Sequence, residues 1–264
     1  MSKPTMAGSS TSTPPLRGRV ALVTGAGRGI GRATAIGVAE AGATVGLMAR
    51  SVDELEEVEK VVTGLGATAF VCPADVGDRE QLADAAAKLT SELGPVDVLV
   101  NNAAVVWPLA PTTSVDPADW ATAMSVNLVG VFTLTSLLLP AMLDRGWGRI
   151  VNVSSGIVDH PDGMIGGNAY ATSKAGLEAH TKNLAAELAG TGVTVNAYRP
   201  GGVDTAMQAW IRGQPPDEIG AALHGRFQNS YDQGSLITAD HSALSLITRL
   251  TGDDNGQIWS VDDA

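Results

Sequence analysis

The chain has 264 residues and carries 28 acidic against 17 basic side chains, which gives a formal net charge of -11 at pH 7. A field of that sign repels phosphates, so the composition excludes a general binder of nucleic acids or anionic membranes. With 44% hydrophobic residues, the chain has enough apolar side chains for one large α/β domain with a sizeable core.

The composition also bears on the compartment. Cys72 is the only cysteine, so an internal disulfide is excluded and an oxidising compartment is not indicated. We expect no membrane span, because no run of about 18 apolar residues is present. Residues 1–17 form a Ser/Thr/Pro-rich stretch without the apolar core of a signal peptide, and we expect a disordered tail there. The expected location is the cytoplasm.

From Arg19 onward, short apolar runs alternate with helical patterns, as in βαβ units. This alternation predicts an α/β fold: a single Rossmann-type, doubly wound parallel sheet of about seven strands with helices on both faces. Residues 18–264 would form one domain. The predicted strands cover 20–24, 44–49, 67–72, 96–100, 149–153, 194–198 and 257–261.

A glycine-rich turn follows the first predicted strand directly and leads into a helical pattern that ends near Ala41. Glycines there let the chain turn tightly and let backbone N–H groups approach a pyrophosphate at a helix N-terminus. The pattern is Thr-Gly-x-x-x-Gly-x-Gly rather than the strict G-x-G-x-x-G fingerprint. The predicted cofactor contacts in this turn are Gly25, Arg28, Gly29, Ile30 and Gly31.

The tip of the second strand bears on which dinucleotide is bound. An acidic residue there would bind the ribose hydroxyls of NAD(H), whereas a cation would bind the 2′-phosphate of NADP(H). Arg50 stands at this tip, with Arg28 in reach of the same corner, so we predict NADP(H), with NAD(H) as the alternative. Arg50 has another interpretation, as a solvated residue ahead of a helix capped by Ser51 with Glu54.

Two further strand ends supply predicted cofactor contacts. Asp75 and Val76 follow the third strand, and Asp75 is a candidate to bind an adenine amino group or, alternatively, an ordinary turn residue. Asn102 and Ala103 follow the fourth strand, where small side chains leave room for a ligand and the Asn amide can tie loops together.

Tyr170 and Lys174 lie four residues apart in a helical pattern, which places the phenol and the ammonium on one face. A Tyr ionises near pH ~10, so acid/base work near neutrality needs a cation that stabilises its phenolate. Lowering the pKa by three units takes roughly 4 kcal/mol, far more than the ~0.5 kcal/mol of an exposed helical pair. The pair therefore predicts a low-dielectric cleft with further positive charge, which a bound nicotinamide would supply.

Two other features of the pattern are unusual. Asn127 falls inside a long apolar helix that Asp116 and Pro117 open, so its amide needs solvent or a polar partner. The stretch 206–234 interrupts the regular alternation, and we interpret it as a helical lid over the strand ends.

In their order, these motifs resemble the classical short-chain dehydrogenase/reductase family over essentially the whole of 19–262. The matching segments are Thr24 to Gly31, Asp75, Asn101-Asn102-Ala103, Asn127, Ser155, Tyr170-xxx-Lys174 and Pro200-Gly201. The resemblance implies that the chain is an oxidoreductase acting on CH-OH groups, which transfers a hydride between the dinucleotide and a carbonyl or secondary alcohol.

The resemblance also implies roles for individual residues. Tyr170 would be the general acid/base, Ser155 would position the substrate carbonyl, Lys174 would bind the nicotinamide ribose, and Asn127 would hold a water linking Lys174 to solvent. The cofactor contacts implied after the sixth strand are Pro200, Gly201, Val203 and Thr205.

The sequence departs from the family pattern at three places. Ala104 replaces the usual glycine, the chain between Ser155 and Tyr170 is about two residues longer, and the last residues lack the usual Asp-Gly-Gly. The longer loop leaves Ser154 as the alternative to Ser155. The helices near 117–143 and 168–189 resemble those that pair subunits in this family, which predicts a homotetramer or homodimer.

Other functions remain as alternatives. One is a catalytically silent dinucleotide-binding sensor on the same fold. A serine hydrolase is disfavoured because Val153 to Gly156 is not a G-x-S-x-G elbow, and the four histidines have no metal-ligand spacing, so no metal is predicted.

The predicted substrate is a small apolar ketone or alcohol. A 3-oxoacyl thioester is the alternative, ranked lower because an acidic surface disfavours docking of an acidic carrier protein. The predicted pocket residues, besides Ser155, are Trp107, Ile157, Met207 and Trp210, with Val105, Val106 and Met164 as further candidates.

Overall fold

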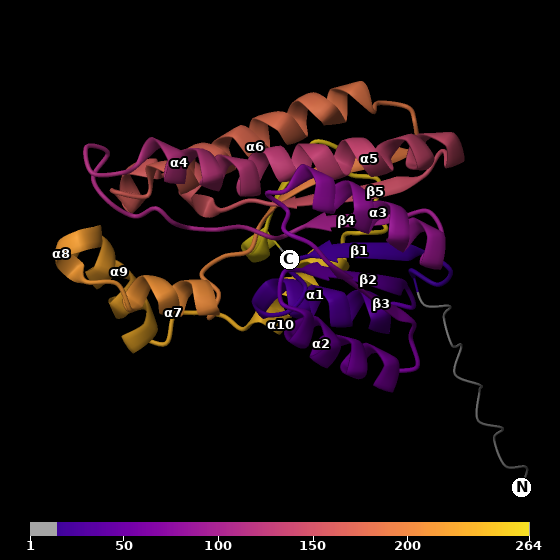
Figure 1. Ribbon diagram of the computed structural model, residues 1–264, viewed down its shortest axis with the longest axis horizontal. Coiled ribbons are helices and arrows are strands. Elements are labelled where there is room, and N and C mark those ends of the chain that lie inside the picture. Colours follow the sequence, from indigo (N-terminus) through magenta and orange to yellow (C-terminus); the bar gives the residue numbers. More distant parts are fainter. Residues whose placement is uncertain (1–14, 264) are drawn as a thin grey trace, which may run out of the picture.

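The computed structural model describes residues 15–263, which build a seven-stranded parallel sheet in the order β3-β2-β1-β4-β5-β6-β7 (Figure 1). The strand order reverses at β1, the place where parallel sheets bind ligands at their carboxyl edge. This arrangement confirms the predicted fold class. The strands are β1 (Val20–Thr24), β2 (Thr44–Ala49), β3 (Ala69–Pro73), β4 (Val98–Asn101), β5 (Gly148–Val153), β6 (Val193–Arg199) and β7 (Ile258–Ser260).

Helices cover both faces of the sheet (Figure 1). Three of them, α1 (Gly29–Glu40), α2 (Val52–Gly64) and α10 (Ala239–Ile247), pack their apolar residues on one face. On the opposite face lie α3 (Arg79–Leu93), α5 (Gly130–Arg145) and α6 (Asn168–Glu187). The strands are apolar on both sides because each face is buried, as parallel sheets require.

The long helix predicted from Asp116 is divided in three. An α-helix, α4 (Pro117–Met124), passes through a π-helix, η1 (Ser125–Val129), into α5. Asn127 lies in the π segment, where one wider turn re-aims the side chains. Helix interruptions of this kind leave no clear mark in an apolar pattern, which is why the sequence predicts one continuous helix.

The stretch from α4 to α5 is also long and apolar enough for a membrane span, by length and composition only. It has 29 residues and a mean hydropathy of 1.9 over its best 18-residue window. A core helix of a soluble protein has the same properties, and Leu134, Leu138 and Met142 of α5 do pack in the core. The expectation of no membrane span therefore stays a prediction.

The predicted tail ends earlier than residue 17. Residues 1–14 lie outside the described part of the chain, but Leu16 is only 1% exposed and packs in the core beneath α1. Its backbone N–H donates to the carbonyl of Ala41 at 2.8 Å. Leu16 therefore belongs to the folded domain rather than to a tail.

The predicted lid is helical and projects from the sheet (Figure 1). It contains α7 (Ala206–Arg212), α8 (Pro216–Ile219) and α9 (Ala221–Asp232). A parallel bridge between Val203 and Ile237 joins the two ends of this segment. The lid therefore leaves and re-enters the domain at one place, beside the end of β6.

Candidate active site

The turn between β1 and α1 has the shape of a phosphate cradle. Gly25 has φ +65°, in the left-handed region, and a Cβ at Gly31 would lie 2.1 Å from the carbonyl oxygen of Gly25. No other residue type fits at Gly31 without moving the turn. Gly29 and Ile30 form the first turn of α1, and a Cβ on Gly29 would lie 3.3 Å from the Thr205 methyl group.

The ends of β1 and β4 are joined by polar groups. The Thr24 hydroxyl accepts from the backbone N–H groups of Asn102 and Ala103, each at 3.0 Å. The Asn102 amide donates to the carbonyl of Thr24 at 2.9 Å. The predicted tie between neighbouring loops is therefore present, and it fixes two of the predicted cofactor segments against each other.

The corner at the end of β2 is lined by two exposed ion pairs. Arg28 lies 3.5 Å from Glu54, and Arg50 lies 3.7 Å from Asp75. Ser51 is the N-cap residue of α2 but makes no side-chain capping bond, and the Glu54 carboxylate faces Arg28 instead. The Arg50 side chain is 70% exposed, which agrees with its interpretation as a solvated residue, and its role toward a cofactor stays a prediction.

Asp75 has a second role besides its ion pair with Arg50. Its carboxylate accepts from the backbone N–H of Gly77 at 2.8 Å, which is the turn geometry that the sequence offered as the alternative to adenine binding. The next residue, Val76, has its carbonyl against Gly130, where a Cβ would lie 2.1 Å away. This strand end is thus held close to the start of α5.

Tyr170, Lys174 and Ser155 come together at the carboxyl end of β5. Lys174 is only 3% exposed, and its Nζ donates to the carbonyl of Val153 at 2.7 Å. That Nζ lies 5.7 Å from the centroid of the half-buried Tyr170 ring. One turn of α6 thus presents the phenol and the ammonium to the same strand end.

The pKa values show what burial does to this pair. Burial raises the pKa of Tyr170 above its ordinary value, while a hydrogen bond with the Ser155 side chain acts in the opposite direction. Burial lowers the pKa of Lys174 to about 8. Both shifts disfavour the charged forms, which is the direction opposite to activation of the phenol; the extra positive charge of a nicotinamide stays a prediction.

Asn127 has the polar partner that its place in an apolar helix demands. Its side-chain oxygen accepts from the Val105 N–H at 2.8 Å, and its amide donates to the Val105 carbonyl at 2.8 Å and to the Ser173 hydroxyl at 3.0 Å. The side chain is fully buried. It therefore clamps the loop after β4 against α6, and its role in holding a water stays a prediction.

The structure separates the two candidate serines. Ser154 is buried, and its hydroxyl donates to the Glu178 carboxylate at 2.7 Å. Ser155 is half-buried, forms the N-cap of the short 3-10 helix η2 (Gly156–Val158) through the Ile157 N–H at 3.3 Å, and its side chain acts on the pKa of Tyr170. Of the two, Ser155 is the one that lies beside the phenol.

Known proteins match this chain in sequence and in structure. The family model described as short chain dehydrogenase matches residues 19–215. The chain belongs to the short-chain dehydrogenase/reductase family. Acetoacetyl-CoA reductase from Shinella zoogloeoides is 39% identical over 240 residues, covering 91% of this chain and 93% of that protein. The 3-oxoacyl-[acyl-carrier-protein] reductase of Thermotoga maritima is 40% identical over 194 residues, covering 73% and 77%.

A solved structure agrees with the sequence match. A candidate NAD(P) dependent gluconate 5-dehydrogenase from Beutenbergia cavernae, with NADP bound at low occupancy, superposes with a TM-score of 0.81 at 36% identity. The match covers 94% of this chain and 97% of that one. This short-chain dehydrogenase/reductase is therefore an NAD(P)-dependent oxidoreductase that acts on CH-OH groups of small molecules.

The residues present fit the dinucleotide of the family. The glycine turn, which packs too closely for a Cβ at Gly31, leads into the N-terminus of α1, where a pyrophosphate fits, and Lys174 supplies a buried cation for a ribose. After β6, the predicted contacts Pro200, Gly201, Val203 and Thr205 lie on one loop; a Cβ on Gly201 would lie 2.8 Å from the Val261 side chain. Thr205 caps α7, so this loop also carries the lid.

The predicted pocket residues fall into two groups. Ile157 and Met207 pack, together with Tyr170, against an apolar cluster that joins the loop after β4 to the lid. Trp107 is half-buried, and Trp210 is 40% exposed on α7; neither belongs to this cluster. The cluster consists of Val106, Leu109, Met164, Ile211, Ile219 and Leu223.

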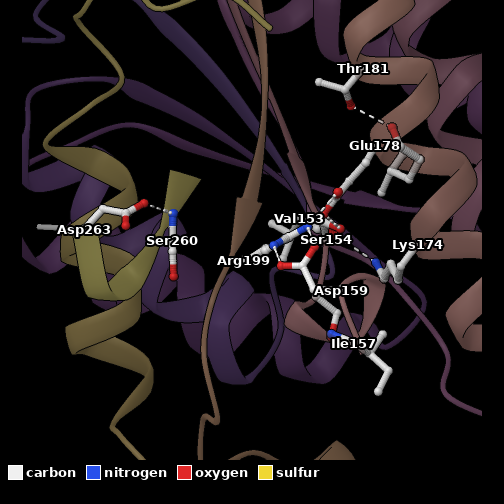
Figure 2. A network of polar contacts seen from close by, with 12 residues as sticks. Val153, Ser154, Ile157, Asp159, Lys174, Glu178, Thr181, Arg199, Ser260 and Asp263 are labelled. Atoms are coloured by element: carbon white, nitrogen blue, oxygen red, sulfur yellow. Dashed lines mark hydrogen bonds and ion pairs between the residues drawn. The ribbon is translucent and has the colours of Figure 1, made fainter. Parts of the chain in front are cut away.

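Three charged residues behind the site, Glu178, Arg199 and Asp159, are not among the predicted site residues. Arg199 bonds to both carboxylates, and all three adjoin predicted site segments (Figure 2). A signal was present: Glu178 follows Lys174 by one helical turn on the buried face of α6. Its partners lie on other elements, so the linear pattern does not show the cluster.

Proposed function

We propose that this enzyme reduces the carbonyl of a small apolar ketone with NADPH, or oxidises the corresponding secondary alcohol with NADP. The observation that carries the proposal is the apolar cluster around Tyr170, which the lid and the loop after β4 build on the side of the phenol. An apolar wall with a few convergent polar groups is the usual form of a small-ligand site.

The chemistry follows from the residues at the end of β5. The nicotinamide, when bound, supplies or accepts the hydride. Tyr170 donates the proton to the substrate oxygen in reduction and takes it back in oxidation, and Ser155 donates a hydrogen bond to the same oxygen. Lys174, fixed by the Val153 carbonyl, stabilises the phenolate that remains after proton transfer.

The exposed arginines support the preference for NADP(H). Arg28 and Arg50 flank the end of β2, and their side chains are 67% and 70% exposed. Exposed ion pairs contribute only about 0–1 kcal/mol, so both guanidinium groups can leave their carboxylates for a 2′-phosphate at little cost. A fork of planar donors also matches phosphate oxygens well.

A second candidate substrate is a 3-oxoacyl thioester. Two of the relatives above are named as reductases of this class, one for acetoacetyl-CoA and one for a carrier-bound chain. The net charge of -11 disfavours an acidic carrier protein more than it disfavours a free thioester. Acetoacetyl-CoA is therefore the thioester to test first.

We also propose a cytoplasmic homotetramer or homodimer. Val129, Phe132 and Leu137 on the outer side of the long helix are 54%, 57% and 44% exposed, an apolar face that a second copy would cover. Size-exclusion chromatography with light scattering tests this: a Phe132→Glu variant should have a smaller assembly mass, and a monomeric parent protein would contradict the proposal.

The first experiment is a fluorescence titration of the protein with NADPH and NADH, followed by a panel of small ketones and acetoacetyl-CoA. We expect tighter binding of NADPH and turnover of apolar ketones that Tyr170→Phe abolishes. Tighter binding of NADH would overturn the cofactor preference. Turnover of acetoacetyl-CoA alone would replace the ketone by the thioester as the substrate.

A further inference from the structure

A buried carboxylate lies directly behind the catalytic residues. Glu178 on α6 is 5% exposed and follows Lys174 by one helical turn. Its carboxylate accepts from the Ser154 hydroxyl at 2.7 Å and from Arg199 Nε and Nη2 at 2.8 and 2.9 Å. Charge-assisted bonds at these distances are the strong ones, and the guanidinium contact is bidentate.

Arg199 extends this contact to a third segment. It is the last residue of β6, and its Nη2 also donates to Asp159 at 2.9 Å, with a second contact from Nη1 to the same carboxylate. Asp159 is the C-cap of η2. Figure 2 shows the guanidinium lying between the two carboxylates, with Lys174 on the adjacent turn of α6.

Each end of this cluster adjoins a residue of the site. Ser154 precedes Ser155, Arg199 precedes the Pro200-Gly201 loop, and Asp159 lies two residues after Ile157. We propose that Glu178 and Arg199 are positioning residues. They fix Ser155, the loop that begins at Pro200 and the η2 segment against α6, the helix that carries Tyr170 and Lys174. This inference rests on the proposed function of the same site.

The cluster also has an electrostatic consequence for Lys174. The Glu178 carboxylate is one turn away on the same helix face, and Arg199 neutralises it. The pKa of the Asp159 carboxyl in the same cluster is lowered, chiefly by its hydrogen bond with Arg199 and to a smaller extent by the charges of His160 and Lys182. Without Arg199, the uncompensated carboxylate would stabilise the protonated Lys174 and oppose ionisation of Tyr170.

The variants that test this role are Arg199→Met, Glu178→Gln and their combination. In alcohol oxidation, Tyr170 must accept a proton, so Arg199→Met should move the pH midpoint of kcat upward by at least half a unit. It should also lower kcat at least tenfold. Adding Glu178→Gln removes the carboxylate and should return the midpoint, but not kcat, to the parent value. A purely structural role would not produce this pattern.

A matched control is available at the other end of the sheet. Arg149 is also a buried arginine with one carboxylate partner, Asp253 at 3.2 Å, but it lies near the start of β5. Arg149→Met should lower the melting temperature while leaving kcat and the pH midpoint within twofold and 0.2 units of the parent. If Arg199→Met behaves in the same way, the positioning role is refuted.

Cofactor binding separates this inference from the proposed function. NADPH titration needs no substrate, and Arg199→Met should weaken NADPH binding at least fivefold, whereas Arg149→Met should not. If the parent turns over no ketone in the panel, the substrate proposal fails while this measurement still decides the positioning role. If Arg199→Met does not fold, Asp159→Asn and Arg199→Lys replace it, because both variants keep a cation at position 199 beside the buried Glu178. Unchanged NADPH binding in both of these variants would overturn the inference.

Discussion

Two arginines at the carboxyl edge of the sheet, Arg50 and Arg199, differ in how deeply they and their partners are buried. At the end of β2, Arg50 is 70% exposed and lies 3.7 Å from a half-buried Asp75. At the end of β6, the Arg199 side chain is 16% exposed and contacts the Glu178 side chain, itself 6% exposed, at 2.8 Å. An exposed pair contributes about 0–1 kcal/mol, whereas removing one partner of a buried pair costs roughly 3–5 kcal/mol.

This difference separates a site that can change partners from one that holds its geometry. Arg50 loses little by leaving Asp75, so its charge is available to a ligand. Arg199 is committed to two carboxylates, and the burial of Glu178 makes any rearrangement costly. The end of β6 is therefore rigid, and the end of β2 is adaptable.

The largest effect that we expect is from a change at the rigid end. Tyr170→Phe removes one hydroxyl and keeps the ring that packs against the lid cluster. Loss of general acid/base catalysis costs typically 10²–10⁴-fold, and we expect kcat to fall by about that factor. NADPH affinity should stay within about twofold of the parent, and a kcat above one tenth of the parent value would exclude Tyr170 as the acid/base.

The second prediction concerns Lys174, whose burial makes function and stability compete. Its pKa is lowered from 10.5 to about 8, so the buried charge costs roughly 3 kcal/mol near neutral pH. The bond to the Val153 carbonyl returns about 1 kcal/mol. Lys174→Met should therefore abolish activity and still raise the free energy of unfolding by about 2 kcal/mol.

The stability gained by Lys174→Met should change with pH in a definite direction. The folded Lys174 releases its proton near pH 8, whereas the unfolded side chain keeps it up to about 10.5. Between these values the unfolded parent binds more protons, so the stability of the parent rises with pH. The advantage of Lys174→Met should be complete below pH 8 and shrink toward pH 10.5 in urea titrations. A constant difference would mean that burial does not lower the pKa of Lys174.

The strands could be predicted where local pattern decides the structure. The bounds of β1 and β2 agree with the predicted 20–24 and 44–49, because each is an apolar run closed by a turn. The fourth strand differs: β4 includes Asn101, whose amide pairs with Asn152 on β5. That bond joins residues 51 positions apart, and no local pattern contains it.

The same limit applies to the candidate site. The glycine turn and the Tyr170–Lys174 spacing are local features, so the sequence alone reveals them. The partners of Asn127, Arg50 and Arg199 come from other elements, at separations that topology sets. Residues whose predicted roles depend on local spacing can therefore be found in the sequence, whereas their partners on other elements cannot.

The third prediction tests the adaptable end. Arg50→Ala should weaken NADPH binding about tenfold and leave NADH binding unchanged, because a single charge-assisted phosphate contact contributes about 1.4 kcal/mol. Lys60→Ala is the control, since Lys60 on α2 is another exposed cation, paired with Glu57 at 2.6 Å. Fluorescence titration with both dinucleotides measures the ratio. An equal loss of NADPH affinity in the two variants would show that NADPH binding depends only on the overall charge of the protein.

The smallest effect is expected where α9 of the lid contacts the segment after β5. Arg226 on α9 donates to the backbone carbonyl of Gly163 in the 3-10 helix η3 (Pro161–Met164). A substitution can remove this hydrogen bond only at Arg226, because Gly163 contributes its backbone. Because Arg226 is exposed, Arg226→Ala should raise KM by about two- to threefold, equal to roughly 0.5 kcal/mol, with kcat unchanged. Its control is Gln228→Ala on the same helix, whose side chain bonds only to Asp232 nearby. A fall in kcat without a change in KM would place the lid contact in the chemical step and extend the rigid region at the end of β6 to α9.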